Sequence, residues 1–248
     1  MLKALGFFHF RENVEDPAGS LRLELERTGT ENDISGSLIV LPEAFNLGEP
    51  YYSGAPGPAK IPLGQALDQL RGIARQWSVT FVAGLLGQQY NSAYWLDHKA
   101  TSELMCHKMV NDRTGHYVPH SGERRCDERN PFKAEDACVG VLICADALEE
   151  TSAVRERRER LLRYIKRCSR PYRILCVPGQ MGSHCDPHFA RASHMEIADR
   201  DCSDDSPSFV IPPRTASNPS ICAESGFCLP SSHCDICRLG NVDLFGQF

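Results

Sequence analysis

Short apolar runs alternate with longer amphipathic stretches along most of the chain. Apolar runs of a few residues between turn residues are typical of buried strands, whereas apolar positions that recur every three or four residues are typical of helices. The pattern predicts strands near residues 3–10, 37–42, 79–85, 89–96, 103–109, 137–143 and 173–177. It predicts helices near residues 17–28, 63–76, 151–168 and 185–198. The 248 residues therefore fit one α/β domain of the larger kind.

Short turns separate three of the predicted strands. Residues 87–91 and 97–101 have the composition of hairpin turns, and each joins two consecutive strands. Strands joined by such short turns run antiparallel, while strands joined through a helix run parallel. We therefore expect a mixed sheet.

Two long segments have no pattern of strand or helix. Residues 46–62 are rich in proline and glycine, and residues 111–136 are rich in charged side chains. Long loops of this kind are usually either functional or disordered. We expect these two segments to form walls of a binding pocket.

Three reactive side chains follow apolar runs. Glu43 comes after Leu-Ile-Val-Leu-Pro, Lys108 lies at the end of a predicted strand, and Cys144 comes after Val-Gly-Val-Leu-Ile. In open α/β sheets, ligands bind beyond the carboxyl ends of strands, so the three side chains are candidates for one site. In the alternative interpretation, Glu43 and Lys108 form an ordinary ion pair and Cys144 is an inert core residue.

The residue types suit acyl-transfer chemistry. The segment around Cys144 has a strand-to-turn-to-helix pattern, which predicts a tight elbow that exposes the sulfur atom and directs following backbone N–H groups at a developing oxyanion. Glu43 is a carboxylate that can take and return a proton. Asp146 is suited to cap the helix that follows.

In this order, Leu-Pro-Glu after an apolar strand, a lysine at the end of a middle strand, and Gly-Val-Leu-Ile-Cys-Ala-Asp resemble the motifs of the nitrilase, or carbon–nitrogen hydrolase, superfamily. The resemblance covers roughly residues 3–200. It implies a four-layer α-β-β-α sandwich of the nitrilase type, usually assembled into homodimers or larger homo-oligomers. It also implies action on amides, nitriles or carbamoyl groups without a metal or organic cofactor.

The resemblance also implies roles for individual residues. Cys144 would be the nucleophile, Glu43 the general base and acid, and Lys108 a stabiliser of the tetrahedral oxyanion. The backbone N–H of Ala145 would complete the oxyanion hole.

Many members of the superfamily carry a second glutamate in the loop after the lysine. Glu123, in His-Ser-Gly-Glu, is the nearest candidate for that position. Glu128 and Glu135 compete with it.

The chain departs from the family pattern after the cysteine. Ala145 stands where the family commonly has an aromatic residue, and no Phe-Pro-Glu-like element follows. Beyond Ala198 the composition shifts to serine, proline and cysteine, and the expected strand that ends in asparagine is hard to find. We therefore predict a carbon–nitrogen hydrolase domain over residues 1–200 and an atypical Ser/Pro/Cys-rich segment over residues 201–248.

The charge balance limits the classes of binding partner that we expect. The chain has 27 basic and 32 acidic residues and a net charge of −5, so we expect neither nucleic acid nor a membrane surface as its main partner. The first ten residues are too short for a signal peptide, and no apolar run approaches about 18 residues. We therefore expect a cytoplasmic protein whose twelve cysteines are mostly reduced.

Four cysteines crowd into the C-terminal segment. Cys222, Cys228, Cys234 and Cys237 lie within 16 residues, and the last two form one C-x-x-C pair. A structural zinc site of this kind usually needs a second pair, which is missing. We expect thiols here and no metal, with a zinc-stapled interaction module as the alternative.

The predicted helix near residues 151–168 is strongly basic. Nine of the 27 basic residues lie between Arg155 and Arg173, while Leu161, Leu162 and Ile165 share one helical face. We expect that face to pack on a sheet and the charges to be solvated, with anion binding as the alternative.

Together these features predict a cysteine-dependent hydrolase of non-peptide carbon–nitrogen bonds. The substrate would be a small amide or N-carbamoyl compound, hydrolysed through a thioester acyl-enzyme with release of ammonia or an amine. The alternative is a nitrilase-like binding or scaffold protein that has lost turnover.

Overall fold

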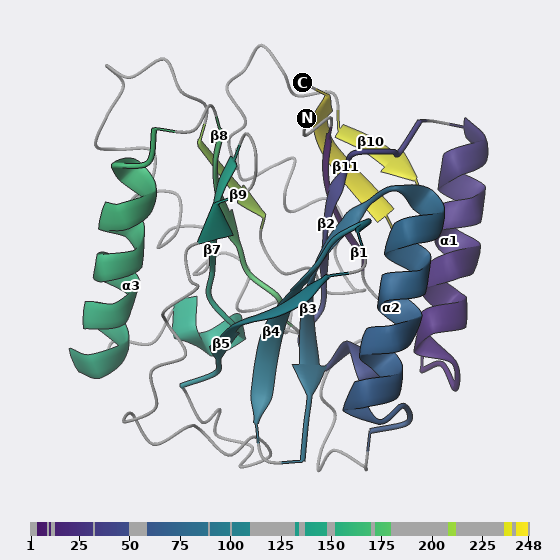
Figure 1. The fold of residues 1–248 in the computed structure, drawn as a ribbon, viewed down its shortest axis with the longest axis horizontal. Coiled ribbons are helices and arrows are strands. Elements are labelled where there is room, and N and C mark those ends of the chain that lie inside the picture. Colours follow the sequence, from purple (N-terminus) through teal and green to yellow (C-terminus); the bar gives the residue numbers. More distant parts are fainter. Residues whose placement is uncertain are drawn as a thin grey trace.

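The protein is described by a computed structural model. It describes residues 4–8, 10, 13–31, 33–49, 59–88, 90–99, 101–109, 132–133, 137–147, 152–169, 172–179, 208–211, 236–239 and 242–247. These residues form two β-sheets and accompanying helices in a mixed α/β arrangement (Figure 1).

The larger sheet has the strand order β10-β11-β1-β2-β3-β4-β5. Its strands are β1 (Ala4–Phe8), β2 (Leu38–Leu41), β3 (Thr80–Leu86), β4 (Asn91–Leu96), β5 (Ser102–His107), β10 (Ile236–Leu239) and β11 (Val242–Gln247). Strands β1, β2 and β3 pair in parallel, and all other neighbouring strands of this sheet pair antiparallel. The predicted mixed sheet and its two hairpins, β3–β4 and β4–β5, are therefore confirmed.

The smaller sheet has the strand order β6-β7-β8-β9. Its strands are β6 (Phe132–Lys133), β7 (Ala137–Val141), β8 (Tyr172–Cys176) and β9 (Ser208–Ile211). β7, β8 and β9 run parallel, whereas β6 pairs antiparallel with β7. The end of β7 leads directly towards Cys144.

Helices lie on opposite sides of the molecule (Figure 1). Helices α1 (Pro17–Glu31) and α2 (Leu63–Trp77) lie together beside the larger sheet, and α3 (Ser152–Lys166) lies beside the smaller one. In α2, the buried residues recur at helical spacing and form the stripe that faces the sheet: Ala66, Leu70, Ile73 and Ala74. The 3-10 helices η1 (Phe45–Leu47) and η3 (Cys144–Ala147) follow β2 and β7.

Strand β2 is apolar on both faces because both faces are covered. Leu38 and Val40 belong to one buried cluster, whereas Ile39 and Leu41 belong to another that also includes α1 and α2 residues. Side chains alternate across a strand, so a fully apolar strand is the pattern of a sheet buried on both sides.

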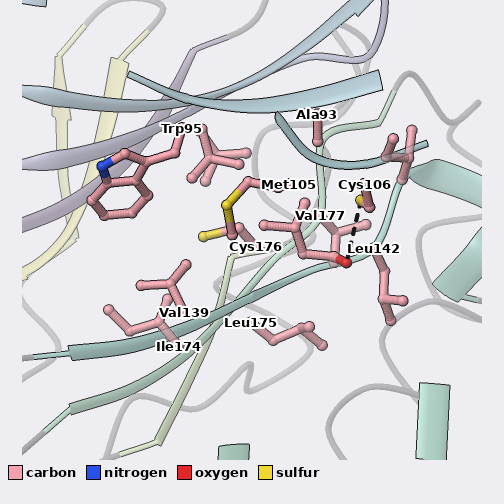
Figure 2. Packing of buried hydrophobic residues seen from close by; sticks show 14 of the residues in the cluster. Ala93, Trp95, Met105, Cys106, Val139, Leu142, Ile174, Leu175, Cys176 and Val177 are labelled. Carbon is pink, nitrogen blue, oxygen red and sulfur yellow. Dashed lines mark hydrogen bonds between the residues drawn. The ribbon is translucent and has the colours of Figure 1, made fainter. Parts of the chain in front are cut away.

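The two sheets share a buried core (Figure 2). Ala93, Trp95 and Met105 of the larger sheet belong to the same cluster as Val139 and Ile174 of the smaller one. Cys106 also lies in this cluster, and its Sγ donates to the Val141 carbonyl over 3.7 Å. This core fixes the position of one sheet relative to the other.

Four of the cysteines in or beside strands and helices of the described part of the chain differ from Cys144 in having no proposed role. All of them are buried and free of disulfides: Cys106, Cys138, Cys168 and Cys176. Burial raises the pKa of the Cys176 thiol far above its ordinary value, so this group stays protonated and unreactive.

The predicted strands from residue 3 to residue 177 and the first three helices are confirmed within a few residues. The predicted helix at 185–198 lies outside the described residues. Strands β6, β9, β10 and β11 were not predicted, and β6 lies within residues 111–136, which showed no pattern of strand or helix. These strands extend the two sheets: β6 pairs with β7, β9 with β8 and β11 with β1. The domain boundary at residue 200 stays a prediction. Within the described part of the chain, no helix combines the length and apolar character needed to cross a bilayer.

Gly140 allows α3 to pack closely on β7. A Cβ atom at this position would overlap Ile165 Cδ1 and would lie 3.2 Å from Leu161 Cδ1. We predict that Gly140→Ala lowers the free energy of unfolding by about 1–3 kcal/mol, because the buried Ile165 side chain must leave its position. Chemical denaturation monitored by circular dichroism measures this change.

The control variants separate overpacking from the general effect of replacing glycine. Gly72 lies inside α2, where an added Cβ would meet nothing within 4 Å, so Gly72→Ala should stabilise the protein by up to about 1 kcal/mol. Ile165→Val removes the overlapping Cδ1 and should recover part of the loss in Gly140→Ala. Equal stability of Gly140→Ala and the wild type would contradict this account of the α3–β7 contact.

Candidate active site

Glu43 and Lys108 form a buried ion pair. Glu43 lies two residues after β2, and Lys108 comes directly after β5. Lys108 Nζ lies 2.6 Å from Glu43 Oε1, and the side chains of Lys108 and Glu43 are 1% and 0% exposed. Two charges removed from water in this way carry a large desolvation cost that only close pairing and further hydrogen bonds can offset.

Asn91, the first residue of β4, contacts both members of the pair. Its Nδ2 donates a hydrogen bond to Glu43 Oε1, and its backbone carbonyl accepts the N–H of Lys108 over 2.9 Å. Asn91 is itself buried. The start of β4, which lies between β2 and β5 in the sheet order, therefore connects the ends of these two strands.

The two carboxylate oxygens of Glu43 differ. Oε1 accepts hydrogen bonds from Lys108 and Asn91, whereas Oε2 is buried without a hydrogen-bond partner among the described residues. A buried carboxylate oxygen with no partner is costly. Oε2 is thus the oxygen of Glu43 that has the capacity to accept a further hydrogen bond.

Cys144 lies on a tight turn after β7. Its φ is 47°, a left-handed conformation that is unfavourable for a residue with a side chain. Its N–H donates to the Pro178 carbonyl over 2.8 Å, and the residue is 8% exposed. The chain turns sharply here, as the strand-to-turn pattern predicted, but Cys144 is buried, so the prediction that the elbow exposes this residue is wrong.

Gly84 on β3 links the Glu43 region to the Cys144 region. A Cβ at this position would lie only 2.7 Å from Glu43 Cα and 3.1 Å from Pro178 Cβ. Because the Pro178 carbonyl accepts the N–H of Cys144, Gly84 lies between Glu43 and a residue that binds the Cys144 backbone.

Asp146 makes a second link, from the Cys144 turn to the Lys108 segment. Its two carboxylate oxygens lie 3.0 and 3.1 Å from the N–H of Met109, which follows Lys108. The sequence suggested Asp146 as a helix cap and gave no sign of this contact. These contacts connect the Glu43–Lys108 pair to the Cys144 turn, and all three residues follow the C-terminal ends of strands: β2, β5 and β7.

The structure describes only some of the other candidate site residues. Ala145 is the second residue of η3, directly after Cys144. Glu123 and its two competitors, Glu128 and Glu135, lie outside the described residues. Of the four clustered cysteines, only Cys237 lies within the described residues, in β10. The described part of the chain holds no group of three side chains that could bind a metal ion.

Sequence reasoning missed three residues that organise this region. An isolated glycine inside a strand pattern often marks a close backbone approach, and this signal points to Gly84. Asn91 was read as part of a turn, and only its burial beside Glu43 reveals its role. Arg157 lies in a run of charged residues, so its burial could not be read from the sequence.

A separate groove lies at the C-terminal end of α3. Arg160, Arg163, Tyr164 and Arg167 contribute to its lining, which does not include Glu43, Lys108 or Cys144. Cations near a helix C-terminus are stabilised by the helix macrodipole, so this group of arginines does not require a bound anion.

Several solved structures share the fold. A mutant of the amidase from Nesterenkonia sp. AN1 in complex with butyramide is 16% identical, with a TM-score of 0.53, over 78% of this chain and 73% of that chain. The carbon–nitrogen hydrolase from Helicobacter pylori G27 is 14% identical, with a TM-score of 0.53, over 85% and 73%. Saccharomyces cerevisiae Nit3, a member of branch 10 of the nitrilase superfamily, is 14% identical, with a TM-score of 0.57, over 85% and 75%.

The family assignment comes from the sequence itself. No curated protein matches this chain significantly. The model of the carbon–nitrogen hydrolase family, however, matches residues 31–183, which is more than half of the chain and includes Glu43, Lys108 and Cys144. The resemblance drawn from the three motifs is confirmed, and the chain belongs to the carbon–nitrogen hydrolase family.

Proposed function

We propose that the protein is a cysteine-dependent hydrolase of small amides or N-carbamoyl compounds. Cys144 is the nucleophile, Glu43 the general base and acid, and Lys108 the stabiliser of the oxyanion. The observation that carries this proposal is the buried Glu43–Lys108 pair, which Gly84, Pro178 and Asp146 contacts connect to the Cys144 turn.

We also infer that the layers follow the α-β-β-α order of the nitrilase type. Three observations support this inference: α1 and α2 share a core with the larger sheet, the two sheets share a second core, and α3 packs on β7. The active site in this arrangement lies where strand ends of both sheets meet.

In the acylation step, Glu43 takes the thiol proton and the Cys144 sulfur attacks the carbonyl carbon of the amide. We assign proton transfer to Oε2, because Oε1 already accepts hydrogen bonds from Lys108 and Asn91. The ammonium group of Lys108 and the backbone N–H of Ala145 stabilise the negative oxygen of the tetrahedral intermediate. The C–N bond then breaks, and Glu43 returns the proton to the departing ammonia or amine.

In the deacylation step, Glu43 removes a proton from water, which attacks the thioester carbon. The second tetrahedral intermediate collapses to the carboxylic acid, and the sulfur leaves with the proton held by Glu43. One water is consumed for each amide, and the enzyme returns to its starting state without an added cofactor.

Small amides are the substrate class that we favour. The solved complex of the amidase from Nesterenkonia sp. AN1 with butyramide supports this choice, as does family membership. Assembly into a homodimer or larger homo-oligomer and location in the cytoplasm stay predictions from the sequence.

We predict that the purified protein releases ammonia from at least one class within a panel of small aliphatic amides, ω-amide acids, N-carbamoyl compounds and nitriles. Cys144→Ala should abolish this release, because no other group replaces the nucleophile. A coupled glutamate dehydrogenase assay measures the ammonia.

Cys168→Ala serves as the matched control, since Cys168 is a buried thiol at the end of α3, away from Glu43 and Lys108. It should keep wild-type activity. Ammonia release that persists in Cys144→Ala would refute the nucleophile. A folded wild-type protein that releases none from any class would favour the binding or scaffold protein instead.

The contribution of Lys108 can be measured separately. We predict that Lys108→Met lowers kcat by about 10²–10³-fold, as expected for removal of one oxyanion donor. Lys99→Met, at the exposed β4–β5 turn, should stay within about twofold of wild type. Circular dichroism must show that the Lys108 variant is folded, because its loss leaves Glu43 buried without its cation. A folded Lys108→Met with wild-type kcat would remove Lys108 from the mechanism.

A further inference from the structure

We propose that Arg157 is a positioning residue for the reaction. Through a hydrogen bond to the His107 carbonyl and an ion pair with Asp146, it fixes the backbone on both sides of Lys108 and connects this segment to the Cys144 turn. This inference rests on the proposed function, which assigns Lys108 and Cys144 their roles.

Arg157 reaches from α3 to the end of β5. Its side chain is 7% exposed, and its Nη1 donates to the carbonyl of His107 over 3.1 Å. The same nitrogen lies 3.6 Å from Asp146 Oδ2. A single guanidinium nitrogen therefore contacts both the Lys108 strand and the turn that carries Cys144.

The two contacts hold the residues directly before and after Lys108. His107, which precedes it, is held by Arg157 directly, and Met109, which follows it, is held by the Asp146 carboxylate. The N–H of Lys108 itself is bound by the Asn91 carbonyl. The backbone of three consecutive residues is thus fixed by partners from three different elements.

The ion pair also balances charge in the buried region. Glu43 and Asp146 are both fully buried carboxylates, and Lys108 and Arg157 are buried cations. Lys108 pairs with Glu43 and Arg157 pairs with Asp146. Loss of Arg157 leaves the buried Asp146 carboxylate without this cation, which disfavours the geometry in which Asp146 holds the N–H of Met109.

Position matters because Lys108 has to meet the oxyanion at hydrogen-bond distance. Displacement of a catalytic group by about 1 Å can cost on the order of 10²-fold in rate. A shift of Lys108 weakens an interaction made in the transition state, so it lowers kcat more than it raises KM.

The test compares Arg157→Met, Arg157→Lys and the matched control Arg155→Met, which changes an exposed arginine on the same helix. With the best amide of the panel, we expect kcat to fall about 10–100-fold in Arg157→Met while KM changes less than about threefold. Arg157→Lys, which keeps the charge, should recover part of the loss. Arg155→Met should match the wild type.

A double-variant cycle tests whether Arg157 acts through Asp146. If it does, Arg157→Met combined with Asp146→Asn loses much less kcat than the product of the two single losses. A merely structural role predicts changes in unfolding temperature without this coupling in kcat.

The outcomes separate this inference from the proposed function. If the wild type is active and a folded Arg157→Met keeps its kcat, Arg157 is not a positioning residue although the function stands. Failure of both Arg157 variants to fold would also overturn the inference, because Arg157 would then act on stability.

If the wild type releases no ammonia, the proposed function fails and the rate of Cys144 alkylation by iodoacetamide decides instead. Peptide mass spectrometry distinguishes Cys144 from the other eleven cysteines. A rate changed at least fivefold in Arg157→Met but not in Arg155→Met would support the link to the Cys144 turn. Equal rates would overturn it.

Discussion

The ion pair between Glu43 and Lys108 is the constraint on which the rest of this region depends. Its atoms are 2.6 Å apart, and both side chains are almost completely excluded from solvent. Such a pair is often no more stabilising than apolar residues of the same size, so stability alone does not explain it. It is tolerated here because Asn91 adds a hydrogen bond to Glu43 and fixes the backbone of Lys108. As a result, Oε1 of Glu43 accepts two hydrogen bonds, whereas the buried Oε2 accepts none from the described residues.

The surrounding fold makes this arrangement rigid. Strand β2 is buried on both faces, so its end, and Glu43 with it, cannot move without disturbing two cores. The shared core between the sheets fixes β7 and β8, from which Cys144 and Pro178 follow. Gly84 then permits the close approach that joins the Glu43 and Cys144 regions. Interiors packed in this way transmit small displacements, so we expect substitutions outside the reacting atoms to affect the site.

The sequence predicted most of the strands because their apolar runs are short, continuous and bounded by turn residues. It predicted Glu43, Lys108 and Cys144 for the same reason, since each follows such a run. It did not predict Asn91 or Arg157, because a polar residue reveals its burial only through tertiary contacts. Strands β9, β10 and β11 were missed because their sequence surroundings are rich in serine, proline and cysteine. The pairing of β11 with β1 and of β9 with β8 is a long-range contact that no local pattern encodes.

In the proposed mechanism, Cys144 becomes acylated during turnover. Acid quenching during steady-state turnover of a small amide, followed by peptide mass spectrometry, measures this directly, and hydroxylamine added before the quench converts the thioester to a hydroxamate. The account predicts an acyl group on the Cys144 peptide that hydroxylamine removes and that Cys144→Ala lacks. Ammonia release with neither an acyl group on Cys144 nor a hydroxamate would contradict it.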